Sequence, residues 1–478
     1  MPVASSAVAE QVRGAGASVA FDAASLARAV NGTIVREGRV AIRGGAVDSR
    51  HVEAGNAFFA LPGELTDGHR FVVDAARRGA AALVVSEQLS AADMERLLNV
   101  GDPTVIKVED PTVALQQAAS AWRNRFQPLV VGVTGSLAKT STKEQIAEVL
   151  TERWTVLRNE ANENNEIGLP RTMLRLGPEH DVAVLEMGMY EAGDIALLAS
   201  LARPRIGVVT AVRGTHMVRA GSIDAIERGK RELVEALPAG GTAVLNADDP
   251  RVSRMAGSVG EGVEVFTYGF DKRAKVSATE VASLGFDGMS YMLRAGDRTV
   301  EVTTPALGRH SVHNGLAAAA VGLAAGMELE AIAHGLARRW HAPHRTSIVD
   351  LGPIKVLDDA YNASPDSMIA ALDLLATLPG RHVAILGEML ELGDASESAH
   401  RRVADYARDS VDLLVAVGPY TGRGRSELAL VDRDRADEIE PLLRPGDVVL
   451  IKGSRGVQME DFLPALERAA RGMSERIA

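Results

Sequence analysis

The sequence predicts an α/β protein of three domains, and three observations support that prediction. The chain has 478 residues, which is enough for about three domains of ordinary size. Short, continuously apolar runs alternate with helical patterns from residue 129 to about 340, and the alternation resumes in the remaining chain. Such strands are buried on both faces, as in parallel sheets. We expect domains at residues 1–125, 126–340 and 341–478.

The first domain is predicted as a small mixture of short strands and helices. Its expected elements are strands at 33–42, 58–61 and 81–85 and a helix at about 71–78. Asp110 and Pro111 form an N-cap and first-turn pair that begins a further helix, and Pro128 stops it. That helix leads into the second domain.

The second domain is predicted as a parallel sheet with an added β element. The expected strands are LVVGVT, DVAVLEMG, IGVVTAV and TAVLNADD, and the expected helices begin at KEQIAEVL and Ser222. Residues 275–305 alternate apolar and polar side chains and are broken by glycine turns, as in antiparallel hairpins that are either inserted or at a sheet edge. An alanine-rich helix at 312–325 ends at Gly326.

The third domain repeats the alternation and is predicted as a second doubly wound, Rossmann-like sheet. Its expected strands are IKVLDD, HVAILG, DLLVAVG and DVVLIKGS, with helices from Asp366, Ser396 and Gln458. The segment 341–346 is expected to link it to the second domain.

The composition favours a folded protein that acts on small molecules. The formal charge of −11 argues against binding to nucleic acid, which relies on basic surface. The chain has no cysteine, which excludes disulfides, thiolate nucleophiles and zinc–thiolate sites. We found no signal-peptide core and no apolar stretch of membrane-spanning length. We therefore expect a cytoplasmic protein, without membrane insertion, and a monomer.

The segment GVTGSLAKTSTKE at 132–144 joins a strand to a helix, as a phosphate-binding loop does. Backbone N–H groups at the helix start would face phosphates, Lys139 would reach the outer ones, and the Thr140 hydroxyl could ligate magnesium. The match is imperfect, because Ala138 stands where the last glycine is expected and the spacing from Gly135 is short. The alternative is a strand-to-helix turn that binds no ligand.

Polar residues at the ends of predicted parallel strands are candidate ligands. Glu186 ends one strand, where its carboxylate could share a magnesium ion with Thr140; the alternative is a surface glutamate. His216 follows the next strand and Lys230 lies on the following helix. A neutral lysine amine can add carbon dioxide, and the resulting carbamate could bind a second magnesium ion beside His216. The alternative to this metal site is that His216 has a structural role and that Lys230 is a solvated surface lysine.

Two further sets of residues are candidates for binding. His310, His313 and Asn314 lie near the start of the alanine-rich helix, where the Asn314 amide could pair with a purine edge or serve as an N-cap. Three segments begin where strands of the third domain stop, at 358–368, 387–393 and 452–455. Such loops could close over a nucleotide and exclude water, or they are ordinary turns.

These residues resemble the Mur ligases along nearly the whole chain. The likeness includes His216 with Lys230, and GEMLELG with His400. It also includes these motifs: DSR at 48–50, FFALPGELTDGHRF at 58–71, TGSLAKTSTKE at 134–144, NENNEIGLP at 162–170, EMG at 186–188, ADDP at 247–250, HSVHNGLAAAA at 310–320, DDAYNASPDSM at 358–368, GEMLELG at 387–393 and KGSRGVQME at 452–460.

The resemblance implies an N-terminal UDP-sugar-binding domain, a central P-loop ATPase domain and a C-terminal Rossmann-like domain that closes. It implies that ATP phosphorylates the terminal carboxylate of UDP-MurNAc-tripeptide to an acyl phosphate. The amine of D-Ala-D-Ala then attacks, and a tetrahedral intermediate expels phosphate. Two magnesium ions are implied, and a carbamylated Lys230. Most of the rate would come from positioning and charge neutralisation.

The resemblance also assigns residues. The implied catalytic residues are Lys139, His216, Lys230 and Asp359. The implied magnesium ligands are Thr140, Glu186, His216 and carbamylated Lys230. The implied ATP-binding residues are Gly135, Ser136, Lys139, Thr140, Ser141, Asn314 and Arg345. The implied residues for the other substrates are Ser49, Arg50, Asp67, His69, Asn164, Asn165, Asn362, Lys452 and Arg455.

Four positions depart from the family pattern: Ala138 in the loop, Ser311, Ser364 and His344 before Arg345. These departures leave two alternatives to a ligase that joins UDP-MurNAc-tripeptide to D-Ala-D-Ala. One is a related amide ligase that uses a different acid or amine. The other is a non-catalytic nucleotide or UDP-sugar binder whose loop has decayed.

Overall fold

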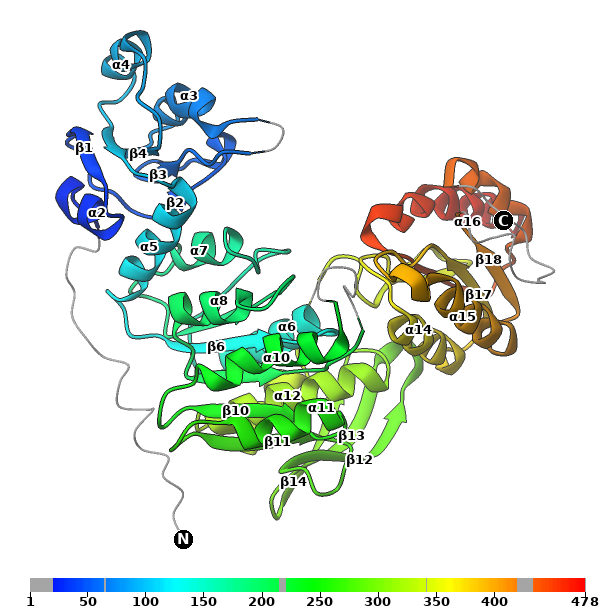
Figure 1. Cartoon of the computed structure of the whole chain (residues 1–478). Helices are drawn as coiled ribbons and strands as arrows, with labels where there is room; N and C mark the ends of the chain where they lie inside the picture. Colours follow the sequence, from blue (N-terminus) through cyan, green and yellow to red (C-terminus); the bar gives the residue numbers. More distant parts are fainter. Residues whose placement is uncertain (1–19, 64–65, 215–220, 341, 419–432, 478) are drawn as a thin grey trace.

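The computed structural model describes residues 20–477 apart from 64–65, 215–220, 341 and 419–432. It contains three separate sheets, which confirms the predicted class of three α/β domains. The N-terminal domain lies above one end of the central domain, and the C-terminal domain lies beside the other end (Figure 1). No helix in the described part of the chain is both long and apolar enough to cross a membrane.

The N-terminal sheet has the strand order β1-β5-β4-β3-β2. Its strands are β1 (Thr33–Arg36), β2 (Gly45–Ala46), β3 (Ala57–Phe59), β4 (Ala82–Val85) and β5 (Thr104–Lys107). Its helices are α2 (Ala23–Ala29), α3 (Val72–Arg77), α4 (Ala91–Leu98) and α5 (Pro111–Arg123). As predicted, Asp110 caps α5, with its carboxylate accepting the N–H groups of Thr112 and Val113.

One predicted strand of this domain is wrong in length. The strand expected at 33–42 stops at Arg36, and Ile42 instead bridges to Phe21. The ladder with β5 is already irregular between Ile34 and Arg36. At Gly38 the chain instead packs closely on the segment before β5, where a Cβ atom would lie 2.3 Å from the Asp102 carbonyl oxygen and the Gly38 N–H is donated to the Thr104 hydroxyl.

The central sheet has the order β14-β13-β12-β11-β10-β9-β6-β8-β7. The strands from β7 (Val156–Arg158) to β12 (Val276–Ser283) in this order are parallel, and β13 (Met289–Ala295) and β14 (Arg298–Thr304) are antiparallel. The other strands are β6 (Leu129–Thr134), β8 (Val182–Glu186), β9 (Ile206–Val209), β10 (Thr242–Asn246) and β11 (Glu264–Gly269). The predicted hairpins therefore form the edge of this sheet.

Helices cover both faces of the central sheet (Figure 1). One face packs against α6 (Lys139–Thr151), α12 (Arg309–Ala324) and α13 (Leu329–Leu336). The other packs against α7 (Gly168–Met173), α8 (Asp194–Ala202), α10 (Ile223–Glu235) and α11 (Pro250–Ser253). Helix α12 starts three residues before the predicted 312, so Asn314 lies inside it. The N-cap position is Gly308, and the alternative role of Asn314 as an N-cap is wrong.

The C-terminal sheet has the order β15-β16-β19-β17-β18, parallel except for β15. Its strands are β15 (Ser347–Asp350), β16 (Lys355–Asp358), β17 (Arg381–Leu386), β18 (Leu413–Ala416) and β19 (Asp447–Lys452). Helices α14 (Pro365–Thr377) and α15 (Ser396–Ser410) cover one face, and α16 (Leu463–Ile477) covers the other. The predicted doubly wound sheet is thus observed.

The domains share apolar contacts to different degrees. One core cluster runs from Phe21 through Trp122 to Leu233 and joins the N-terminal and central domains. The C-terminal domain meets the central one through Leu307 and Phe286, which pack in the cluster beneath α14. The first boundary is therefore the more firmly packed of the two.

Candidate active site

A sharp turn joins β6 to α6 at the carboxyl edge of the central sheet. A Cβ atom on Gly135 would lie 1.8 Å from the Thr210 Oγ1 atom, so only glycine fits there. Ala138 precedes the helix with φ of 62°, a left-handed conformation that glycine adopts more easily. No side chain caps the first turn of α6. Its leading N–H groups are therefore suited to hold an anion.

Lys139 follows this turn, and its ammonium folds back over it. The Nζ atom donates to the Gly135 carbonyl oxygen at 2.9 Å. Burial lowers the pKa of Lys139; the Glu186 carboxylate opposes this shift, and Arg345 adds to it. An incoming phosphate would relieve the repulsion between the two cations, so the loop is organised for a highly charged anion.

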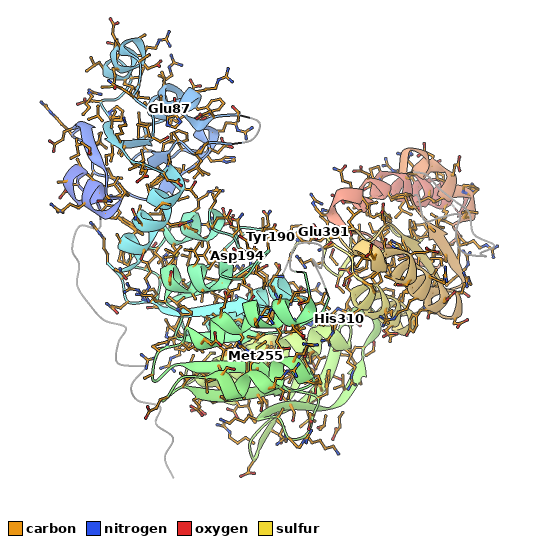
Figure 2. The ribbon with its side chains drawn as sticks, in the orientation of Figure 1. Glu87, Tyr190, Asp194, Met255, His310 and Glu391 are labelled. Carbon is orange, nitrogen blue, oxygen red and sulfur yellow. The ribbon has the colours of Figure 1, made fainter. Side chains whose placement is uncertain are left out.

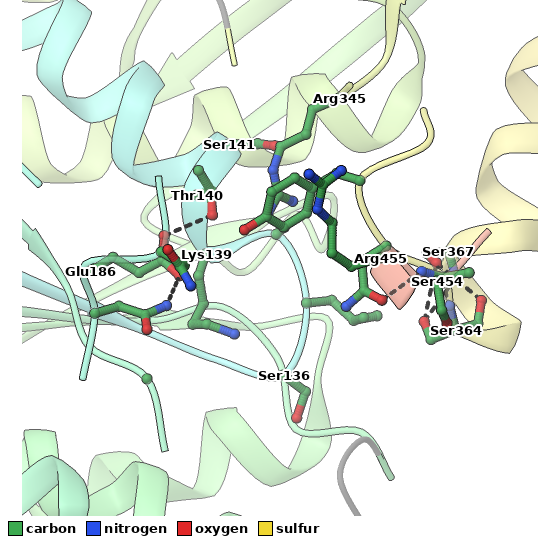
Figure 3. Close-up of a pocket in the computed structure, with 18 of the residues that line it drawn as sticks. Ser136, Lys139, Thr140, Ser141, Glu186, Arg345, Ser364, Ser367, Ser454 and Arg455 are labelled. Carbon is green, nitrogen blue, oxygen red and sulfur yellow. Dashed lines mark hydrogen bonds between the residues drawn. The ribbon is translucent and has the colours of Figure 1, made fainter. Parts of the chain in front are cut away.

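Glu186 ends β8 with its side chain buried beside the loop (Figure 3). Its Oε2 atom accepts the Thr140 hydroxyl at 2.7 Å, and its Oε1 atom accepts the Asn164 amide at 2.7 Å. These hydroxyl and carboxylate oxygens are the hard ligands that Mg²⁺ prefers. Among the described residues no group of three His, Asp or Glu side chains converges. Phosphate oxygens and water would have to supply the remaining ligands.

Asn159 fixes the backbone of Glu186 from both sides, and the sequence reasoning missed it. Its Oδ1 atom accepts the Glu186 N–H at 2.9 Å, and its Nδ2 atom donates to the Glu186 carbonyl at 3.1 Å. The fully buried Lys143 in turn donates to the Asn159 carbonyl oxygen. An asparagine three residues before the NENNEIGLP motif was the only available signal.

Lys230 lies on α10 with 4% of its surface exposed. Burial, followed by the positive charge of Lys139, holds the pKa of Lys230 well below its usual value. Its amine is therefore more readily neutral than that of a surface lysine, as addition of carbon dioxide requires. His216, its expected partner, lies outside the described residues.

The expected nucleotide residues Asn314 and Arg345 approach from α12 and from the segment before β15. The guanidinium of Arg345 stacks on the ring of Tyr361 at 3.9 Å, and Arg455 approaches the same ring at 6.0 Å. His310 lies one turn before Asn314, and burial lowers its pKa. Tyr361 lies within a motif that the sequence singled out, but its stacking was not predicted.

A buried lysine fastens the loops at the edge of the C-terminal sheet. The Lys452 ammonium binds the Asp359 carboxylate and donates to the Asn362 carbonyl at 3.0 Å. The Ser454 hydroxyl accepts the Leu390 N–H at 2.8 Å. The loops after β16, β17 and β19 are thus joined by hydrogen bonds.

Both sheet edges face one cavity of about 490 Å³ between the central and C-terminal domains. Figure 3 shows the loop and Glu186 on one side and Ser364, Ser367, Ser454 and Arg455 on the other. Its walls include these predicted residues: Ser136, Lys139, Thr140, Ser141, Asn164, Asn165, Glu186, Asn314, Arg345, Asp359, Asn362, Lys452 and Arg455. Gly135, which precedes Ser136 in the loop, is not among the lining residues.

One ion pair connects the P-loop region to the C-terminal domain. The Ser136 hydroxyl donates to the Arg213 carbonyl oxygen at 3.0 Å. The Arg213 guanidinium pairs with Asp249 at 2.5 Å and with Asp366 at 3.3 Å, the latter in the first turn of α14. Neither Arg213 nor Asp366 was predicted as a site residue.

Four of the expected substrate-binding residues, Ser49, Arg50, Asp67 and His69, do not line the cavity. Ser49 and Arg50 belong to a short 3-10 turn capped by Asp48, and hydrogen bonds from Arg50 lower the pKa of Asp48 to about 2. His69 donates from Nδ1 to Asp67 at 2.6 Å, because its Nε2 atom accepts the N–H of Ser86. All four belong to the N-terminal domain.

Comparisons with known proteins agree with this arrangement. Family models match at residues 41–123 (Mur ligase family, catalytic domain), 133–322 (Mur ligase middle domain) and 344–455 (Mur ligase, glutamate ligase domain). The chain is 36% identical to the UDP-N-acetylmuramoyl-tripeptide--D-alanyl-D-alanine ligase of Synechocystis, covering 86% of this chain and 88% of the relative. It is 34% identical to the enzyme of that name from Escherichia coli, with coverages of 88% and 92%.

Solved structures are similar as well. A crystal structure of MurF from Acinetobacter baumannii has a TM-score of 0.85 at 29% identity, covering 94% of this chain and 99% of that one. MurF from Thermotoga maritima in complex with ADP has a TM-score of 0.80 at 26% identity, with coverages of 90% and 98%.

Proposed function

This chain belongs to the Mur ligase family, and we propose that it joins D-alanyl-D-alanine to UDP-MurNAc-tripeptide with ATP in peptidoglycan precursor synthesis. One observation supports this best. A single cavity brings the P-loop and Glu186 opposite the loops fastened by Lys452. Phosphoryl transfer and amide formation can then occur in one enclosed space.

In the proposed reaction, the P-loop N–H groups and Lys139 bind the ATP phosphates. The γ-phosphorus accepts a carboxylate oxygen of the tripeptide, its bond to the bridging oxygen of ADP breaks, and an acyl phosphate forms. The amine of D-alanyl-D-alanine attacks the carbonyl carbon, loses a proton, and the tetrahedral intermediate expels phosphate. Positive charge from Lys139 offsets the charge on the transferring group.

The proposed contacts follow the geometry. The phosphates would contact Gly135, Ser136, Lys139, Thr140 and Ser141, and the adenosine part would contact Asn314 and Arg345. Asp359, Asn362, Lys452 and Arg455 would orient the incoming dipeptide. Asn164 and Asn165 would contact the tripeptide, and Ser49, Arg50, Asp67 and His69 the uridine diphosphate.

The oxygen donors fit magnesium. Thr140 and Glu186 would hold the first Mg²⁺, and His216 with carbamylated Lys230 the second. When bound, the ions would neutralise phosphate charge. The lowered pKa of Lys230 supports the carbamate, because only the neutral amine reacts with carbon dioxide.

We further propose domain boundaries near residues 125 and 340, a monomer, and a cytoplasmic location. The boundaries are supported by the strands, because β1–β5, β6–β14 and β15–β19 fall within the three ranges.

A phosphate-release assay tests the proposal. Purified protein is given ATP, magnesium, UDP-MurNAc-tripeptide and D-alanyl-D-alanine, with each component omitted in turn. We expect release that requires all four. Release only with other acids or amines would indicate a ligase of different specificity. Binding of ATP without any turnover would indicate a non-catalytic protein.

A further inference from the structure

The backbone of Arg213 is hydrogen-bonded to the P-loop at two atoms. The Ser136 hydroxyl donates to the Arg213 carbonyl oxygen at 3.0 Å and accepts the Arg213 N–H at 2.9 Å. The Ser136 N–H donates to the Ala211 carbonyl oxygen at 2.8 Å, and the Thr210 hydroxyl donates to the Leu137 carbonyl oxygen at 2.6 Å. The segment from Thr210 to Arg213 therefore moves together with the P-loop.

A buried carboxylate holds the guanidinium of Arg213. Asp249 belongs to the ADDP motif, to which the proposed function gives no role, and only 1% of its surface is exposed. Its Oδ2 atom accepts the Val212 N–H at 2.9 Å and the Arg213 Nη1 group at 2.5 Å. Its Oδ1 atom accepts the Arg251 N–H at 2.9 Å, in the first turn of α11. The guanidinium is thus fixed to the central domain independently of the C-terminal domain.

The other side of this guanidinium faces the C-terminal domain. The Arg213 Nε atom lies 3.3 Å from the Asp366 Oδ2 atom in the first turn of α14. The two side chains are 40% and 41% exposed, and ion pairs that are open to water are weak. The boundary between the domains, with His310 on the central side and Glu391 on the C-terminal side in Figure 2, is the less firmly packed of the two boundaries. A weak ion pair at such a boundary biases the position of the C-terminal domain without preventing its motion.

Asp366 is connected to the loop that orients the dipeptide in the proposed function. It follows Asn362 by only four residues. Lys452 binds the Asp359 carboxylate and the Asn362 carbonyl oxygen, so this loop is held to the rest of the C-terminal sheet. The ion pair of Asp366 with Arg213 therefore sets how far Asp359 and Asn362 lie from the P-loop.

We propose that Arg213 is a positioning residue, which holds the dipeptide-orienting loop at the P-loop through its ion pair with Asp366. Arg213 does not line the cavity, so it acts through Asp366 and not by contact with a substrate. The inference rests on the proposed function, in which an acyl phosphate forms at the P-loop and the dipeptide amine attacks it.

Loss of this ion pair uncouples the two steps of the proposed reaction. When the loop is displaced, the oxygen of a water molecule bonds to the carbonyl carbon of the acyl phosphate in place of the amine. The bond from that carbon to the phosphate oxygen breaks, phosphate leaves with the electron pair, and the water gives up a proton. The carboxylate is regenerated, and ATP has been hydrolysed without an amide bond.

The test measures phosphate released per amide bond formed. Asp366→Asn removes the ion pair and leaves the buried Asp249 carboxylate with its cation. We expect the ratio to be one for the wild-type protein and clearly above one for this variant. We also expect kcat/KM for D-alanyl-D-alanine to fall about 10-fold, since small displacements of a reacting group cost up to about 100-fold. The affinity for ATP, measured by calorimetry without the other substrates, should stay the same. A ratio of one in the variant, or a loss of ATP affinity that accounts for the lower rate, would overturn the inference.

Two further variants separate the ion pair from other roles of Asp366. Arg402→Gln is the matched control, because Arg402 lies 3.3 Å from the same carboxylate but belongs to the same domain. It should keep the wild-type ratio. Adding Arg213→Gln to Asp366→Asn should cause no further uncoupling, because both changes remove one interaction. Additive losses, or equal uncoupling by Arg402→Gln, would show that Asp366 acts without Arg213.

The domain arrangement can be measured without turnover, which separates this inference from the proposed function. The chain has no cysteine, so Arg273→Cys and Arg471→Cys provide two exposed sites for spin labels, one on each domain. We expect the distribution of distances between the labels to broaden with Asp366→Asn and to stay unchanged with Arg402→Gln. If the wild-type protein forms no amide bond, the proposed function fails, and the broadening alone still supports the ion pair as the link between the domains. Equal distributions in all three proteins would contradict that link whatever the turnover.

Discussion

The edges of the central and C-terminal sheets face the same cavity, but buried groups of opposite charge organise them. At the central edge the Glu186 carboxylate is buried, and its side-chain hydrogen bonds come from the neutral donors of Thr140 and Asn164, with the Lys139 ammonium near it. At the C-terminal edge it is the Lys452 ammonium, which is already paired with Asp359. The central edge thus keeps negative charge for a cation that arrives with substrate, whereas the C-terminal edge uses its charge to hold loops together.

This difference predicts how each edge responds to mutation. A group reserved for a ligand contributes little to the folded state, so its removal should impair activity more than stability. A group that neutralises a buried partner should do the reverse. Four substitutions test the contrast.

The largest effect is expected for Lys139→Ala. We expect phosphate release to fall about 10³-fold, because a positioned donor to the transferring group is lost. The unfolding midpoint should change little, since burial already disfavours the charged lysine. Rates and denaturant curves are measured side by side. A variant that unfolds readily would show that Lys139 belongs with Lys452 as a structural charge.

Next is Lys452→Met, which leaves the Asp359 carboxylate without its cation. We expect the C-terminal domain to lose about 3 kcal/mol of stability, as when one partner of a buried pair is removed. Lys355→Met is the control, because Lys355 pairs with Asp350 near the surface of the same domain. If the two variants unfold at the same denaturant concentration, the proposed difference between the two sheet edges is wrong.

A smaller effect is expected for Asn159→Leu, which removes both hydrogen bonds to the Glu186 backbone. We expect the magnesium concentration for half-maximal phosphate release to rise about 10-fold, as for other residues that orient a metal ligand. Binding of Mn²⁺ measured without turnover should weaken in parallel. Asn99→Leu on the exposed end of α4 serves as control. An unchanged metal requirement would confine Asn159 to a folding role.

The smallest effect is expected for Ala138→Gly. Glycine adopts the observed φ of 62° without a Cβ penalty, which favours the folded loop by about 1 kcal/mol. Its greater freedom in the unfolded chain offsets part of this. We expect a shift of a few degrees at most in the melting temperature and a rate within about 3-fold of wild type. A large gain in rate would mean that Ala138 impairs the natural loop.

The sequence predicted the parts of the site that depend on local order. The loop at 132–144 follows a strand and precedes a helix, and Glu186 ends a strand, so their meeting at one sheet edge follows from topology alone. Asn159 could not be found in this way, because its partner Glu186 is 27 residues distant and the contact depends on backbone geometry. The hydrogen bonds of Lys452 could not be predicted for the same reason, since Asp359 and Asn362 are 93 and 90 residues distant from it in the sequence.

Turn details were also beyond the sequence. The end of β1 depends on a register shift between Ile34 and Arg36, and the early start of α12 depends on the positive φ of Gly308. The prediction that Ser364 departs from a family asparagine now has a local account. Its hydroxyl accepts the Ser367 N–H and completes a capping box at the start of α14.

The core cluster that runs from Phe21 to Leu233 also constrains the order of synthesis. The ribosome releases the N-terminal sheet long before α8 and Leu233, which complete the apolar cluster beneath it. The apolar face of the N-terminal domain that this cluster covers therefore stays exposed to water or to a chaperone until more than half of the central domain has been synthesised. The cores of the C-terminal domain, in contrast, consist almost entirely of residues from 354 onward and can form without delay once its last helix is free.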